Sequence, residues 1–154
     1  MKHIITTAAV AMLALAGCGD GDTDGAAETA MASPTPTGPP QPERQDSVFD
    51  LRTAVESSGY ACSGWEVIAE PIDAIERATC TDQVVVSIHT DASQAQAAIE
   101  NTAEIVTSML DEDSVHLTGP NWSINCGSDL DLCEQFADVL GGEVQVLTPE
   151  DVDD

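Results

Sequence analysis

Two histidines, His89 and His116, are the residues best suited to proton transfer near neutral pH. Each lies in a segment where apolar and polar residues alternate, which predicts a strand with one buried and one polar face. We expect both imidazoles on the polar outer face of one sheet, beside Ser87 and Thr118. A hydrolase also needs a nucleophile and an orienting acid held against the base. The sequence contains no GxSxG, HExxH or phosphate-loop motif, so we expect solvated strand residues and not an enzyme.

Cys18 follows an apolar segment that is typical of an export signal. Lys2 is followed by an apolar run from Ile4 to Ala16, which is too short to span a bilayer, for which about 20 residues are needed. The sequence Leu-Ala-Gly-Cys at 15–18 resembles the bacterial lipobox. That resemblance implies a diacylglycerol on the Cys18 thiol, cleavage before this residue and acylation of the new amine by a fatty acid such as palmitate. Because two or three acyl chains hold a protein stably on a membrane, we expect this protein to be anchored on the extracytoplasmic face of the cell membrane.

Four further cysteines follow the expected anchor: Cys62, Cys80, Cys126 and Cys133. An even number in an exported chain predicts two disulfides. Three pairings are compatible with the sequence, and we favour Cys62–Cys80 and Cys126–Cys133 because each closes a local loop. A zinc site is the alternative, but the spacing contains no CxxC pair.

A second metal-like pattern occurs shortly after Cys18. Asp20, Asp22, Asp24 and Gly25 match the start of an EF-hand loop. The twelfth position of that loop requires a bidentate glutamate, and Met31 stands there instead. We therefore predict no metal and no cofactor.

Charge separates the chain into regions. The full sequence has 28 acidic and four basic residues, and only Arg44, Arg52 and Arg77 are basic after the expected signal. Such a chain repels nucleic acid, which we exclude as a partner. Residues 19–45 contain no Leu, Ile, Val or aromatic residue, so we expect a disordered acidic and Pro/Thr-rich linker over 18–45. This leaves a signal peptide over 1–17, one folded domain over 46–148 and an acidic tail over 149–154.

Hydrophobic periodicity predicts eight elements within the domain. Three helices are expected: one from Ser47 to Ser58, one from Asp91 to about Leu110, and a third that Ser128 caps. The expected strands are Ala78–Cys80, Gln83–His89, Val115–Thr118, Trp122–Cys126 and Glu143–Leu147. The order α-β-β-α-β-β-α-β predicts an α+β two-layer sandwich, with about three helices covering a largely antiparallel sheet.

The hairpin turn at 119–122 is the best candidate for a contact loop. Its residues, Gly119, Pro120, Asn121 and Trp122, combine a tight turn with a large aromatic ring. Tryptophans in a chain with so few aromatics more often belong to the core, so we expect Trp122, like Trp65, to be buried.

The whole chain resembles the small lipoproteins of actinobacteria. The residues that carry the resemblance are LAGC at 15–18, Cys62, Cys80, GPNWSINC at 119–126 and LGGEV at 140–144. The resemblance implies surface anchoring and a small α+β domain, and it brings no catalytic residues. We expect a non-enzymatic module that binds an unknown protein or envelope ligand. An envelope enzyme or enzyme regulator with a site near His89 and His116 is the alternative.

Overall fold

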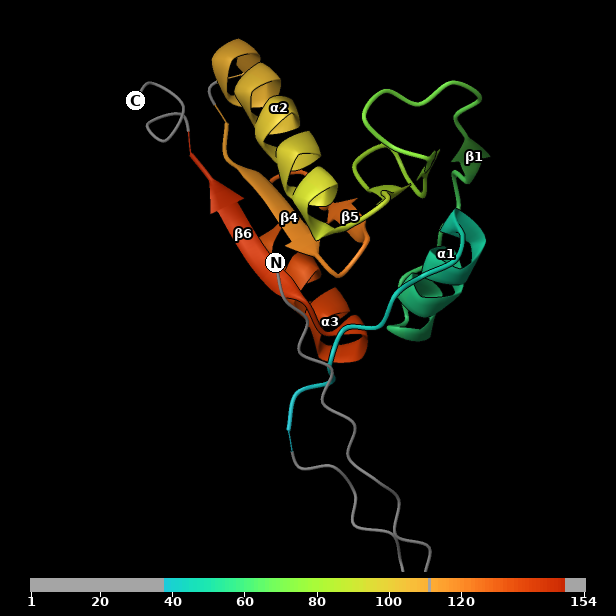
Figure 1. The fold of residues 1–154 in the computed structure, drawn as a ribbon. Helices are drawn as coiled ribbons and strands as arrows, with labels where there is room; N and C mark the ends of the chain where they lie inside the picture. Colours follow the sequence, from blue (N-terminus) through green and yellow to red (C-terminus); the bar gives the residue numbers. More distant parts are fainter. Residues whose placement is uncertain (1–37, 111, 149–154) are drawn as a thin grey trace, which may run out of the picture. The chain divides into compact units, whose positions relative to one another are not determined.

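Three helices and one six-stranded sheet make up the part of the chain that the computed structural model describes, residues 38–110 and 112–148 (Figure 1). Neighbouring strands all pair antiparallel, in the order β1-β2-β3-β5-β4-β6. The predicted α+β fold with three helices is confirmed. The elements are α1 (Val48–Ser57), β1 (Glu66–Val67), β2 (Glu76–Thr79), β3 (Val85–Ile88), α2 (Ala92–Leu110), β4 (Ser114–Thr118), β5 (Trp122–Asn125), α3 (Leu130–Leu140) and β6 (Glu143–Leu147).

One strand was not expected from the sequence. Glu66 and Val67 form β1, which pairs with β2 at the edge of the sheet. Two residues are too few to produce an alternating pattern, so their stretch reads as irregular in the sequence.

The helices are divided between the two faces of the sheet. Helices α1 and α3 cover one face, where Leu51 and Phe136 share the main core with Leu117 and Ile124. Helix α2 crosses the opposite face over β4 and β5 (Figure 1). The covering of both faces adds a third layer to the expected two-layer sandwich. The alternating pattern of the strands predicts that the polar face is exposed to solvent, whereas α2 covers this face.

Capping side chains fix where the helices begin. Ser47 Oγ accepts a hydrogen bond from the Asp50 amide at 3.2 Å, as the sequence predicts for α1. Asp129, and not the expected Ser128, caps α3, because its carboxylate accepts from the Leu132 amide at 3.0 Å. Both residue types cap well, so the sequence alone does not decide between neighbours.

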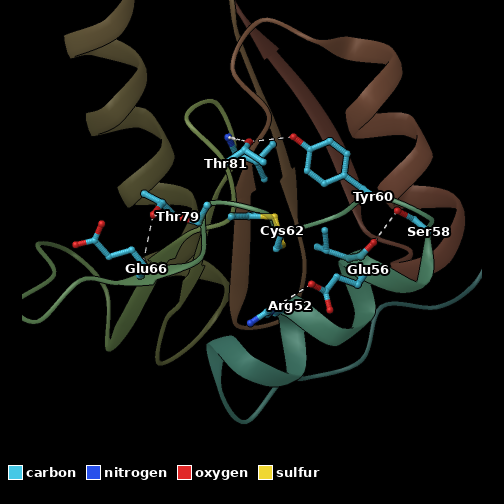
Figure 2. Close-up of a disulfide and its surroundings, with 12 residues drawn as sticks. Arg52, Glu56, Ser58, Tyr60, Cys62, Glu66, Thr79 and Thr81 are labelled. Atoms are coloured by element: carbon cyan, nitrogen blue, oxygen red, sulfur yellow. Dashed lines mark hydrogen bonds and ion pairs between the residues drawn. A yellow bond between two sulfur atoms is a disulfide. The ribbon is translucent and has the colours of Figure 1, made fainter.

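The two predicted disulfides are confirmed. The Cα atoms are 4.4 Å apart in Cys62–Cys80 and 5.8 Å apart in Cys126–Cys133, within the range for bridged cysteines. Figure 2 shows Cys62 between α1 and the strands, where the Tyr60 hydroxyl lies 2.9 Å from Thr81 Oγ1. All four thiols of the domain are used, which removes the zinc alternative.

Several sequence-based predictions concern residues outside the described ranges. These are the signal peptide, lipidation of Cys18, the EF-hand-like stretch and the acidic tail. Among the residues that are described, no helix has the length and apolar character needed to cross a bilayer.

Candidate functional site

The turn at 119–122 is covered by the chain itself. Trp122 is fully buried, as expected, and its Nε1 donates to the Glu43 carbonyl at 2.8 Å. Asn121 pairs with the Gln45 backbone twice, with Nδ2 donating to the carbonyl at 2.8 Å and Oδ1 accepting from the amide at 3.0 Å. Gly119 leaves the space that the indole ring of Trp122 occupies. The polar groups of the expected contact loop are therefore already engaged by the chain's own backbone.

The segment that covers this turn was expected to be disordered linker. Residues 38–45 instead lie on the domain, and we call them the strap. Besides the bonds at the turn, Arg44 Nη2 donates to the Thr90 carbonyl at 3.3 Å, and Pro40 packs against Gly141. The packed chain therefore includes Pro40, several residues ahead of the expected boundary at Asp46. The strap shows no apolar periodicity, since its hydrogen bonds to the domain come from its backbone and from the Arg44 side chain.

His89 is not solvated, contrary to the sequence-based expectation. It is fully buried, with Nδ1 2.9 Å from the Asp73 carbonyl and Nε2 2.9 Å from Ser123 Oγ. Because a carbonyl only accepts, Nδ1 carries the proton and Nε2 accepts from the Ser123 hydroxyl. Burial lowers the pKa of His89, which keeps this imidazole neutral at pH 7.

His116 is buried as well, with 2% of its surface exposed. Its Nε2 lies 2.7 Å from Ser114 Oγ, and burial lowers its pKa to about 4. The expectation of two solvated strand histidines is thus wrong for the same reason at both positions. Each side chain points to the face that α2 covers.

A cavity of about 220 Å³ lies between α2 and the polar face of the sheet. Ser87, Ser123 and His116 form the polar part of its buried wall, and Ala98 and Ile99 of α2 form the apolar part. The remaining lining residues are half-buried: Ile68, Arg77, Val85, Thr102 and Asn125. His116 therefore lines the cavity, whereas His89 reaches it only through its hydrogen bond to Ser123.

Arg77 is the charged residue of this cavity, and the sequence analysis did not single it out. It lies directly opposite Ser87 across β2 and β3, and its Nε donates to Ser87 Oγ at 3.1 Å. Within the described ranges, its two terminal nitrogens donate no hydrogen bond and form no ion pair within 4.0 Å. Burial lowers the pKa of Arg77, and Asp73 partly offsets this, so the guanidinium stays charged. One clue in the sequence could have identified Arg77: it is one of only three arginines after the expected signal peptide, and it lies next to a predicted strand.

The described residues contain no group of three metal-binding side chains. No protein-family model, curated protein or solved structure matches the chain. The geometry of the cavity is therefore the basis for interpreting its function.

Replacing Asn121 by alanine tests whether the turn holds the strap. Asn121→Ala removes two hydrogen bonds to Gln45, and we expect a loss of about 1–3 kcal/mol in the free energy of unfolding. We also expect faster tryptic cleavage after Arg44, the arginine within the strap, measured by mass spectrometry of timed digests. Gln41→Ala is the control, because this exposed side chain of the same segment makes no hydrogen bond with the described residues, so both values should stay unchanged. Equal cleavage rates in the two variants would contradict the role of the turn.

Proposed function

We propose that this protein is a lipid-anchored extracytoplasmic binding module whose ligand occupies the cavity between α2 and the sheet. The lipobox-like sequence at 15–18 supports the anchor, and two disulfides are in keeping with an exported chain. One observation carries the binding role. The cavity is walled by a charged arginine with unused donors and by neutral polar groups, next to an apolar wall.

Such a wall is typical of a ligand site. Small-molecule sites combine apolar lining with a few polar groups that fix orientation. The guanidinium of Arg77 is half-buried and forms no ion pair within 4.0 Å among the described residues, so its terminal nitrogens can still donate to a ligand. A ligand would supply the missing partner, which favours this cavity over the covered turn as the place of binding.

The alternative is an enzyme, and one contact favours it. Ser123 Oγ and His89 Nε2 have the distance and donor direction of a nucleophile and its base. Two features argue against catalysis. Strands β3 and β4 flank β5 on both sides, so the sheet uses the backbone amides beside Ser123 and leaves none as oxyanion donors. The group that orients His89 is a backbone carbonyl and not a carboxylate. Ester hydrolysis that disappears in Ser123→Ala would support the enzyme instead.

The anchor is tested by replacing Cys18. Wild-type protein expressed in a lipoprotein-processing bacterium should enter the membrane fraction, with an amino-terminal peptide that carries acyl chains on Cys18 in its mass spectrum. Cys18→Ala should be released or remain an uncleaved precursor, because it lacks the thiol that accepts the lipid. Thr23→Ala, in the same expected linker, is the control and should behave as wild type. An unmodified Cys18 in wild-type protein, or a mature amino terminus elsewhere, would overturn the anchor.

The cavity is tested by filling it. Ala98 lines the cavity and Ala97 is exposed on the same helix, so Ala98→Leu and Ala97→Leu add the same atoms inside and outside it. We expect small fragments, screened by ligand-observed NMR in charged and neutral versions, to bind wild type and Ala97→Leu. Binding to Ala98→Leu should fall at least tenfold, provided that circular dichroism shows it folded. Fragments that bind all three proteins equally, or none of them, would contradict a ligand site here.

A further inference from the structure

We infer that the cavity binds a short aliphatic carboxylate through the terminal nitrogens of Arg77, an inference that rests on the proposed function of the cavity as a ligand site. The inference follows from which hydrogen-bonding groups of the cavity are already used and which are free. Each polar lining residue can be assigned from its existing partners.

Three lining groups have their hydrogens engaged or fixed. The Ser123 hydroxyl donates to His89 Nε2, and Thr102 Oγ1 donates to the Ala98 carbonyl at 2.8 Å. His116 is a neutral imidazole held by Ser114, so it adds no positive charge to the site. Of these three residues, only His116 can have a hydrogen left to donate, on its second ring nitrogen.

The groups that remain free are donors. Ser87 Oγ accepts from Arg77 Nε, which leaves its own hydrogen to give. Asn125 Oδ1 accepts from the Gly127 amide at 2.7 Å, which fixes the orientation of the amide and leaves its NH₂ group to donate. Together with the terminal nitrogens of Arg77, these form a set of donors that calls for an acceptor-rich ligand.

The charge of the site limits that ligand to a single negative charge. Arg77 is the one charged residue in the lining, and no acidic residue from the described ranges lines the cavity. A phosphate dianion is normally met by several cations, whereas a planar guanidinium matches one carboxylate through two parallel hydrogen bonds. The chain carries 28 acidic residues, those of the described ranges lie outside this lining, and so strong a negative charge opposes the entry of highly charged anions.

The size and the apolar wall define the rest of the ligand. A cavity of about 220 Å³ is smaller than the roughly 300–1,000 Å³ of sites for drug-sized ligands, which suits a carboxylate with a short chain. Its apolar lining residues are branched or small aliphatic side chains: Ile68, Val85, Ala98 and Ile99. A ligand of this size binds weakly, so dissociation constants in the roughly millimolar range are expected.

Isobutyrate and isobutyramide test the inference, because they share a shape and differ in charge. In NMR titrations of the full-length, detergent-solubilised protein at pH 7 and fixed ionic strength, we expect isobutyrate to bind at least tenfold more tightly than isobutyramide. Arg77→Gln should lose at least tenfold for isobutyrate and little for the amide, whereas Arg77→Lys should lose less. Arg52→Gln is the control, because Arg52 pairs with Glu56 on the surface of α1 and should leave both affinities unchanged.

The outcomes separate this inference from the proposed function. Equal affinity of wild type for the acid and the amide, abolished by Ala98→Leu, would overturn the carboxylate and keep the cavity as a ligand site. Binding of neither probe while other fragments occupy the cavity would also overturn the carboxylate alone. If no fragment binds at the cavity, both proposals fail. The comparison on wild-type protein decides the question even if Arg77→Gln does not fold.

Discussion

The packing of α2 against the polar face of the sheet is the contact on which the candidate site depends. The buried stripe of the helix is small, with Ala95, Ala98 and Ala103 around Ile99, and it lies over strands that present serine and histidine. Alanines are too short to fill the space above these polar side chains, and a cavity remains between the layers. Without α2, the same residues would form an ordinary solvated face with no site.

The buried polar face has consequences for charge. His89 and His116 are kept neutral because an imidazolium would lose its hydration under α2. Arg77 cannot lose its proton in this way and remains charged at the half-buried side of the cavity. In a strongly acidic protein, Arg77 thus places a cation beside neutral donors, and the proposed ligand of the cavity rests on this arrangement.

Covalent and hydrogen-bonded links stabilise the parts of the domain that lie outside the cavity. Disulfides join the chain after α1 to the end of β2, and the end of β5 to α3, while the strap is bonded to the turn between β4 and β5. A domain of about 100 residues buries a limited core, so packing alone provides modest stability and these links increase it. The arrangement fits a domain attached through its amino-terminal side, where the strap would meet the expected linker.

Sequence patterns predicted the elements better than their surroundings. Ser47, the alternation over Val84–His89 and the local cysteine spacing each report on a few neighbouring residues, and the helix, the strand and both disulfides follow from them. The burial of the histidines depends on which face α2 covers, and periodicity carries no information on that choice. Arg77 acquires its role from Ser87 on the next strand and from a helix beyond it. The packing of the strap was not predicted because it depends on hydrogen bonds from its backbone and from Arg44, which leave no apolar pattern in the sequence.

The protonation of the two histidines tests the covered polar face most directly. After cleavage before Cys18, His89 and His116 would be the two histidines of the chain, so their imidazole signals can be followed by NMR from pH 8 to about pH 3. An exposed histidine is half protonated at about pH 6.5. The account predicts that both rings are still neutral at that pH, and that His116 titrates only near its lowered pKa of about 4. Titration of both rings with midpoints near 6.5 would show that the face is open to water and would contradict the account.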